Sequence, residues 1–230
     1  SAASDVYKRQ LVYGYIYASQ KKLSKIGIQM TYVTPEPETI NKFLEEYTFE
    51  RIEEWFNKLI TGFKRWTDYT FDERHKRTES IRELKFPYEY REGQKNLCVS
   101  VYRAIEDNTN LYIQAPTGVG KTLSTVFPAV QALGQQMSDK IFYLTSKTIT
   151  RTVAEDTYAI LRDNGLHMRT VTLTAKDKIC PLDERNCNPV ACPYAKGHFD
   201  RINDAVYDII TSQMVIGRDN VMEYANRHNV

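Results

Sequence analysis

The stretch that decides the expected fold is Ala115-Pro116-Thr117-Gly118-Val119-Gly120-Lys121-Thr122. It follows a β-rich run at 110–114 and precedes a predicted helix at 122–133, which is the strand–loop–helix context of a phosphate-binding loop. Gly118 and Gly120 can adopt backbone angles closed to other residues, so successive N–H groups can surround an anion. Lys121 is expected to reach the outer phosphates of a nucleotide, and Thr122 to bind Mg²⁺. The N-terminus of the following helix favours the same phosphates through its dipole.

One position departs from the pattern G-x-x-x-x-G-K-[ST], because Ala115 stands where the pattern has glycine. The form A-x-T-G-x-G-K-T resembles the variant used by superfamily 2 helicases. A chance G-K-T in a surface turn is the alternative, and the surrounding strand, glycines and helix argue against it. Lys121 and Thr122 are the catalytic candidates, and the nucleotide-binding candidates in this loop are Ala115, Pro116, Thr117, Gly118, Val119, Gly120, Lys121 and Thr122.

The composition sets limits on the class of protein. A chain of 230 residues has room for one full domain and part of another, and its 42% hydrophobic content supports a real core. The net charge of +2 is too small to indicate nucleic-acid binding by itself, so any DNA-binding surface must be local. No run approaches the ~20 consecutive apolar residues of a membrane span, and no signal-peptide pattern begins the chain. We therefore expect a cytoplasmic protein with no membrane partner.

Both ends of the chain look abrupt. Residues 1–10 have no clear periodicity and no initiator Met, and they resemble read-through of a sequencing adapter, so we expect an artefactual leader there. The other end stops at His228-Asn229-Val230 with no evident cap or stop signal after a helical pattern. We expect an internal fragment of a longer protein.

Residues 11–33 are expected to be the remnant of an upstream domain. An aromatic helix at 11–19 precedes an alternating strand at 26–33, and these two elements alone cannot form a domain. The pair resembles the end of a RecB-like nuclease, in which a Q-x-x-x-Y helix precedes a final strand. Any other helix and strand end fits equally well. No nuclease activity is expected, because the metal-binding carboxylates of such a nuclease would lie upstream of Ser1.

Residues 34–85 are expected to form a helical linker. Pro35 interrupts the chain, and apolar residues then recur at three- and four-residue spacing from Thr39 to about Tyr69, which predicts one or two amphipathic helices. The charged stretch at 70–85 is expected to continue as a solvated helix. Its basic residues could instead contact a phosphate backbone.

The aromatic segment at 86–94 marks a domain boundary, because Pro87 breaks the preceding pattern. It resembles the element ahead of the phosphate loop in helicases of the DinG and XPD type, where a glutamine recognises adenine and nearby aromatic rings can stack on the base. A carboxamide offers both a donor and an acceptor to adenine, so the candidates are Tyr88, Arg91 and Gln94. A capping turn before a helix at 95–106 is the alternative. Cys98 lies within that helix and is expected to pack in the core.

Two more strands complete the expected sheet, at 140–145 and 168–174, with a helix from 146 to about 165 between them. The order of strands and helices predicts a parallel α/β sheet with ligands at the carboxyl ends of its strands. Hydroxyl and basic side chains at the second strand end suit phosphate oxygens, and they resemble the helicase motif that holds single-stranded DNA. N-capping by Ser146 would explain part of this pattern without DNA. The DNA-binding candidates are Thr145, Lys147, Thr148 and Arg151.

Three cysteines follow, Cys180, Cys187 and Cys192, spaced C-x6-C-x4-C between turn-forming prolines. In a cytosolic chain this clustering favours metal binding over disulfides. Zinc sites usually show close C-x2-C pairs, so the spacing favours an iron–sulfur cluster, which needs a fourth ligand. His198 is one candidate; in DinG- and XPD-like helicases a fourth cysteine follows a helical stretch, which here would lie just beyond Val230. A zinc site and coincidence remain alternatives.

Taken together, residues 86–230 resemble the start of the first motor domain of a DinG/XPD-like iron–sulfur superfamily 2 helicase. That resemblance implies an α/β fold: a partial P-loop RecA-like parallel sheet, a mostly helical iron–sulfur insertion and an N-terminal helical segment. The implied motor domain covers 86–174 and the truncated insertion 175–230. The implied cofactors are ATP, Mg²⁺ and a [4Fe-4S] cluster, and the implied partners are single-stranded and forked duplex DNA, bound by a monomer.

By the same resemblance the full protein would couple ATP hydrolysis to 5′-3′ translocation and unwinding, in DNA repair. No D-E-A-H-like carboxylate pair occurs before Val230, so the fragment alone is expected not to turn over ATP. A non-catalytic nucleic-acid-binding or metal-sensing P-loop module is the alternative. The hypothesis of a P-loop kinase or transporter ATPase is less favoured, because Ala115 replaces the first glycine of the motif. No L-S-G-G-Q-like run supports a transporter.

Overall fold

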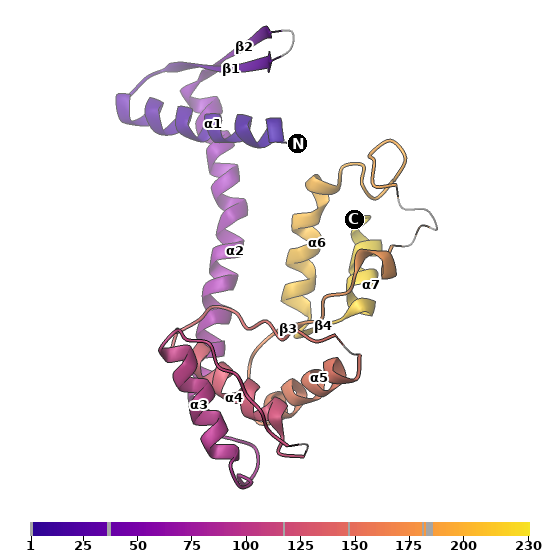
Figure 1. The fold of residues 1–230 in the computed structure, drawn as a ribbon. Coiled ribbons are helices and arrows are strands. Elements are labelled where there is room, and N and C mark those ends of the chain that lie inside the picture. The colour runs from indigo at the N-terminus through magenta and orange to yellow at the C-terminus, as the bar shows by residue number, and fades with distance from the viewer. Residues whose placement is uncertain (1, 36–37, 117, 147, 181, 183–185) are drawn as a thin grey trace. The chain divides into compact units, whose positions relative to one another are not determined.

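The computed structural model describes residues 2–35, 38–116, 118–146, 148–180, 182 and 186–230 (Figure 1). The chain divides into two compact units, residues 1–71 and residues 72–230. The division falls inside one long helix, α2 (Phe49–Glu83), which contributes its first turns to one unit and its last turns to the other. In the described part of the chain, none of the helices combines the length and apolar character needed to cross a membrane.

The first unit packs helix α1 (Ala2–Lys21) against a two-stranded antiparallel hairpin. The hairpin consists of β1 (Lys25–Pro35) and β2 (Glu38–Thr48), with Lys25 opposite Thr48 and Ile28 opposite Glu45. This register places the buried side chains of Ile28 and Tyr47 on one face of the hairpin, because directly opposed residues share a face. They form a core with Leu11 of α1 and Ile52 of α2.

The predicted strand at 26–33 is confirmed, but the predicted helix is wrong over residues 39–48, which form β2. The 34–85 segment is therefore not helical throughout. Pairing with β1 satisfies the backbone of 38–48, and this tertiary contact outweighs the local apolar spacing that suggested a helix. The predicted helix at 11–19 is confirmed as part of α1, which also runs through most of the expected leader.

The second unit begins with the last turns of α2 and contains the expected loop. Three predicted helices are confirmed within two residues at each end: α3 (Gln94–Glu106), α4 (Lys121–Gly134) and α5 (Thr148–Asp163). Beyond them lie β3 (Thr170–Val171), a 3-10 helix η1 (Lys176–Lys178), α6 (His198–Ser212), β4 (Val215–Ile216) and α7 (Arg218–His228).

The hydrophobic core of the second unit is built around α4. Val126 and Val130 of α4 pack with Leu161 of α5 and with Ile81 near the end of α2. Gln131 Nε2 also donates to the Leu84 carbonyl oxygen at 3.1 Å, just past the end of α2. The last part of the expected linker is therefore a structural part of this unit, and the unit begins upstream of the predicted boundary at residue 86.

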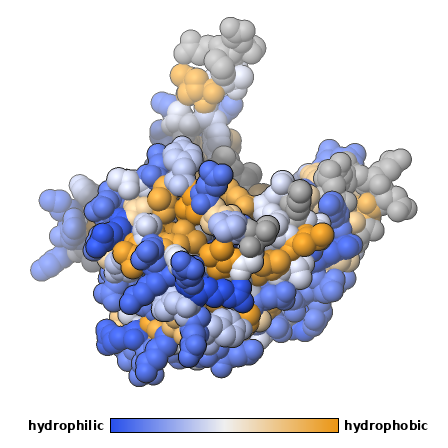
Figure 2. Space-filling model, turned by 60° about the horizontal axis from the view of Figure 1, so that its bottom comes forward, coloured by the Kyte–Doolittle hydropathy of each residue, from blue (hydrophilic) through white to orange (hydrophobic). Residues whose placement is uncertain are grey.

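Two of the three expected strands are not strands in the structure, and both segments leave apolar side chains exposed. Residues 110–114 and 140–145 have no regular secondary structure, with Tyr112 93% and Leu144 87% exposed. In the third, Thr170 and Val171 pair in parallel with Val215 and Ile216. Figure 2 looks onto the end of this unit where α3, α4 and α5 lie and shows apolar surface bordered by hydrophilic side chains. The parallel sheet of three strands stays an expectation.

Candidate functional site

Two glycines of the loop before α4 have backbone angles that favour glycine. Gly118 (φ 89°) and Gly120 (φ 75°) both lie in the left-handed region, which confirms that the loop needs glycine at these two positions. The helix that follows begins at Lys121, so its first backbone N–H groups face the loop. Val119 is half-buried, and Thr117 lies outside the described residues.

Lys121 is held by its own loop. Its Nζ donates to the carbonyl oxygens of Ala115 (2.9 Å) and Pro116 (3.0 Å). The ammonium is therefore already oriented toward the centre of the loop, and incoming phosphate oxygens could replace the two carbonyls. Thr122 is half-buried in the first turn of α4, next to Lys121, and its role at Mg²⁺ stays a proposal.

Arg91 and Gln94 meet this loop from a distant part of the sequence. Arg91 Nη1 donates to the carbonyl oxygen of Gly118. The buried Gln94 lies against Gly120, because an added Cβ there would be 2.8 Å from Gln94 Nε2. The structure thus brings together the loop and two of the three residues proposed from the 86–94 segment.

The side-chain contacts of Gln94 also fit the alternative of a turn. Gln94 Oε1 accepts the backbone N–H of Arg91 at 3.0 Å, which closes the turn that leads into α3. The Nε2 group faces the phosphate loop at Gly120. The carboxamide therefore links the turn to the loop, and its reading of adenine stays a proposal.

The aromatic residues of this segment divide into two groups. Tyr88 is 58% exposed, whereas Tyr90 stacks on Phe86 with ring centroids 4.2 Å apart, and Phe86 packs edge-on against Phe127 of α4. Burial raises the pKa of Tyr90. Phe86 thus joins the segment to α4 with Tyr90 stacked on it, a difference from Tyr88 that the sequence did not show. Cys98 is buried as predicted, and burial raises the pKa of its thiol.

The DNA-binding candidates lie at the start of α5. The Thr145 and Thr150 hydroxyls are hydrogen-bonded, so the end of the 140–145 segment is tied to the first turn of the helix. Thr148 is the first residue of α5, and Arg151 lies one turn from Glu155, with Nε 3.7 Å from Oε1. Lys147 lies outside the described residues. Thr145, Thr148 and Arg151 are exposed, and their contact with a phosphate backbone stays a proposal.

The three cysteines differ in burial: Cys180 is half-buried, Cys187 is exposed and Cys192 is buried. Within the described ranges, no three His, Cys, Asp or Glu residues are close enough to form a metal site. His198 begins α6 and packs its ring edge-on against Phe199. Thiolates are the usual ligands of an iron–sulfur cluster, but the described positions do not bring the three sulfurs together as a metal site.

Lys176 is a charged neighbour of these cysteines that the sequence analysis missed. Its Nζ donates to Cys187 Sγ at 2.9 Å. The pKa of Lys176 is raised, first by this hydrogen bond and then by the charges of Cys187, Cys180 and Cys192. The direct contact of this ammonium is with the Cys187 sulfur. In the sequence, only its position four residues before Cys180 could have indicated that Lys176 lies near the cysteines.

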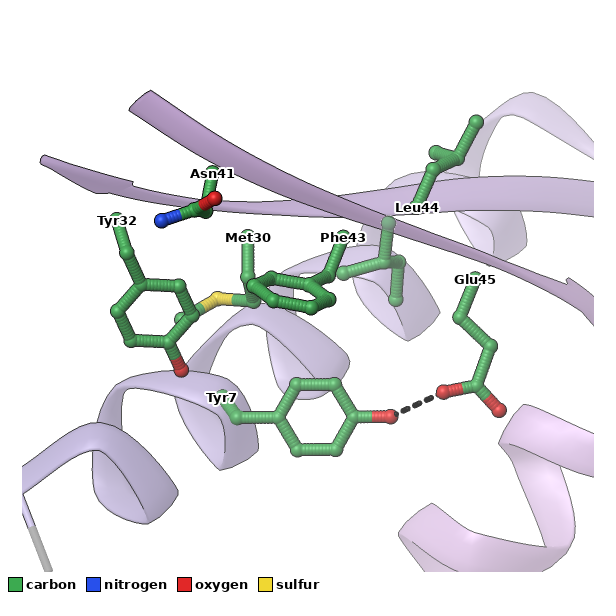
Figure 3. Close-up of a pocket in the computed structure, with 8 residues that line it drawn as sticks. Tyr7, Met30, Tyr32, Asn41, Phe43, Leu44 and Glu45 are labelled. Carbon is green, nitrogen blue, oxygen red and sulfur yellow. Dashed lines mark hydrogen bonds between the residues drawn. The ribbon is translucent and has the colours of Figure 1, made fainter. Parts of the chain in front are cut away.

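A hollow of about 710 Å³ lies in the first unit, whereas the residues proposed for function belong to the second unit. Its walls are the hairpin face and α1, and Tyr7 donates to Glu45 Oε2 across it at 2.7 Å (Figure 3). Burial raises the pKa of Tyr47, whose hydroxyl also bonds Tyr7. Because Tyr7 falls in the expected leader, the hollow carries no functional assignment.

Comparison with known proteins supports the interpretation of the loop. Residues 92–186 match the DEAD/DEAH box helicase family. A stretch of 47 residues is 49% identical to the protein named "Probable ATP-dependent helicase MJ0942" from Methanocaldococcus jannaschii; it covers 20% of this chain and 7% of that relative. No solved structure matches the chain. The part of the chain that holds the phosphate loop is thus similar to superfamily 2 helicases.

Proposed function

We propose that the full-length protein containing this chain is an ATP-dependent DNA helicase of the iron–sulfur type. It would couple ATP hydrolysis to 5′-3′ translocation on single-stranded DNA and to unwinding of forked duplexes in DNA repair. The observation that carries the proposal is the convergence of Lys121, Arg91 and Gln94 on one glycine loop. This convergence falls within the segment that matches the DEAD/DEAH box helicases, apart from Arg91, which directly precedes it.

The chemistry of the proposed site follows from its polar groups. When bound, ATP would supply the free energy for movement, and Mg²⁺ would neutralise phosphate charge. Lys121 would exchange its two carbonyl partners for phosphate oxygens, while the N–H groups at the start of α4 bind the same anion. Thr122 would hold the metal ion. Gln94 would offer its amide to adenine, with Tyr88 exposed nearby in sequence for stacking on the base.

The proposal includes a parallel sheet formed by 110–114, 140–145 and 168–174. The exposed apolar side chains of the first two segments support it, because such side chains are normally covered by neighbouring strands and helices. In this arrangement the phosphate loop and Thr145 both follow a strand end, where ligands bind in open α/β sheets. Thr145, Lys147, Thr148 and Arg151 would contact the DNA backbone there.

Cys180, Cys187 and Cys192 are proposed ligands of a [4Fe-4S] cluster. The fourth ligand would be a cysteine beyond Val230 or His198. The occurrence of three cysteines within thirteen residues, between turn-forming prolines, supports the proposal. The cluster would shape the surface along which the DNA strands separate.

Replacement of Lys121 tests the motor function. In the full-length protein, Lys121→Ala should lower DNA-stimulated ATP hydrolysis on the order of 100-fold, as for loss of one group that stabilises transition-state charge. DNA binding, measured by fluorescence anisotropy, should remain. Lys95→Ala, an exposed lysine of α3, is the matched control. Unchanged hydrolysis in Lys121→Ala contradicts the proposal.

The alternative is a non-catalytic nucleic-acid-binding or metal-sensing module that keeps the loop as a scaffold. The same variant separates the two, because a binding module would show no DNA-stimulated hydrolysis before or after the substitution. Robust hydrolysis by the 230-residue chain alone would contradict our expectation that this part holds only half of the active site.

A further inference from the structure

Glu155 of α5 lies between a DNA-binding candidate and the strand region. The Thr172 hydroxyl donates to Glu155 Oε1 at 2.7 Å. The same carboxylate oxygen lies 3.7 Å from Nε of Arg151, one helical turn earlier. The carboxylate therefore contacts Arg151 on one side and, on the other, the residue that directly follows β3.

The position of Thr172 is fixed by its backbone and by its neighbours. Its N–H donates to the carbonyl oxygen of the buried Ile216 at 2.8 Å, which extends the pairing of β3 with β4 by one residue. Two residues earlier, the Thr170 hydroxyl accepts from Arg162 Nη1 of α5 at 3.2 Å. Because alternate residues of a strand share a face, Thr170 and Thr172 both meet α5 from the same side of the strand. The hydroxyl that binds Glu155 is therefore held in a defined place.

Helix stability does not account for the pairing of Arg151 with Glu155. Both side chains are partly exposed, at 47% and 41%, and an exposed pair contributes little to stability. In a helix the acidic residue is better placed before the basic one, and here the arginine comes first. The distance of 3.7 Å is also longer than a hydrogen bond. An arginine has five N–H donors, so Arg151 can face Glu155 with Nε and bind a phosphate with its terminal nitrogens.

We infer that Glu155 is a positioning residue, which directs the Arg151 guanidinium toward the phosphate backbone of single-stranded DNA and is itself held by Thr172. The inference rests on the proposed DNA contact of Arg151 and names the groups that fix that contact. A side chain that is already oriented loses less conformational freedom when it binds. The carboxylate also places a negative charge near the DNA, and this charge alone would repel phosphates. Positioning and repulsion have opposite effects on affinity, so an experiment can separate them.

The first experiment measures the affinity of the 230-residue chain for a fluorescein-labelled oligothymidine by anisotropy. Glu155→Gln removes the negative charge, and Thr172→Val removes the hydroxyl without a change of charge. Both should weaken binding several-fold, because Arg151 loses its orientation. Asp156→Asn is the matched control: it removes the same charge from an exposed neighbour, so affinity should stay equal or rise slightly. Unchanged or tighter binding in Glu155→Gln or in Thr172→Val would overturn the inference.

Arg151 itself is tested in the same assay. Arg151→Ala should weaken binding about ten-fold, as for loss of one hydrogen bond to a charged group. With Arg151 already replaced by alanine, Glu155→Gln should cause no further loss, and an undiminished further loss would overturn the inference. If Arg151→Ala leaves affinity unchanged, or if the unsubstituted chain binds no DNA, the proposed DNA contact is contradicted and the inference falls with it. A loss in Arg151→Ala without one in Glu155→Gln overturns the inference alone.

A second measurement separates positioning from a general role in folding. The affinity of each variant is followed as the salt concentration rises. Loss of one phosphate contact should reduce the slope of log affinity against log salt by about 1 in Arg151→Ala, and Glu155→Gln should reduce it in the same direction. Urea unfolding should show that Glu155→Gln and Thr172→Val remain folded under the conditions of the binding assay. Weaker binding of Glu155→Gln with an unchanged slope would indicate a structural role and overturn the inference.

Discussion

The two ends of α4 lie in contrasting surroundings. Toward its C-terminus, Val126, Val130 and Leu133 are buried among side chains of α2 and α5. At its N-terminus, the exposed Lys121 donates to two carbonyl oxygens of its own loop, and the nearby 110–114 segment exposes Tyr112. The same helix therefore has one end buried in the hydrophobic core and the other end exposed at a polar site.

The comparison separates the residues of the second unit that are buried by its own side chains from those that stay exposed. The core residues come from 81–168, and they are buried without any ligand. The segments proposed to bind nucleotide and DNA expose apolar or charged groups that a bound partner or further strands would cover. Stability is thus concentrated at one end of α4 and the proposed function at the other.

The largest effect should come from the core. Leu161 is fully buried, and Leu161→Ala should lower the free energy of unfolding by about 2–5 kcal/mol, because it removes buried methyl groups and leaves a cavity. Urea unfolding followed by circular dichroism measures the loss. A loss below about 1 kcal/mol would mean that this core can collapse around the gap, which would weaken the contrast.

An intermediate effect is expected at Glu73, which ties α2 to the strand region. Glu73 Oε2 accepts from Arg169 Nη2 and lies near His167 Nε2, both at 3.2 Å. Burial alone would raise the pKa of Glu73, but the His167 hydrogen bond and the charges of His167 and Arg169 outweigh it and lower the pKa. Glu73→Gln should therefore destabilise the protein at pH 7 by about 1.5 kcal/mol, the range of a hydrogen bond to a charged group.

The sign of the pH dependence follows from the lowered pKa. The carboxylate stabilises the fold above the unfolded-state pKa of about 4.3, and this contribution is lost as the pH falls through the lower folded-state pKa. Urea unfolding at pH 7, 5 and 4 should show the parent and Glu73→Gln converging as the pH decreases. Glu79→Gln, at an exposed pair with His75, is the control and should have little effect. If the difference in unfolding free energy between the parent and Glu73→Gln increased at low pH, the lowered pKa of Glu73 would be contradicted.

The smallest effect on stability should come from the exposed 140–145 segment. Leu144 is 87% exposed, so Leu144→Asn should change the unfolding free energy of the 230-residue chain by no more than about 0.5 kcal/mol. It should also reduce aggregation in light scattering, since it removes an exposed apolar side chain. The same substitution in the full-length protein should cost more if a sheet covers this segment. A large loss in the short chain would show that Leu144 is already packed.

The sequence was a good guide where structure depends on local pattern. Gly118 and Gly120 were expected to adopt backbone angles closed to other residues, and both have positive φ angles. The helices α3, α4 and α5 were predicted within two residues at each end. Cys98 is buried because it lies on the apolar face of such a helix.

Prediction failed where a distant partner decides the outcome. Residues 39–48 fit a helical spacing, and pairing with β1 makes them a strand instead. The contacts of Arg201 with Asn229, and of Glu73 with Arg169, join residues 28 and 96 positions apart, and neither side of these contacts carries a local signal. Gln94 was predicted in part. Its place at the nucleotide site was expected, whereas its hydrogen bond to Arg91 corresponds to the alternative of a turn before the helix.

The continuity of α2 has a practical consequence for anyone who expresses the second unit alone. The sequence suggests cutting at the Pro87 turn, yet such a cut would remove Ile81 and Leu84 from the core and Glu73 from Arg169. A shortened chain should therefore begin before Asp72, within the exposed stretch of the helix. A capping residue such as serine placed there would supply the first N–H groups of the new helix end with an acceptor.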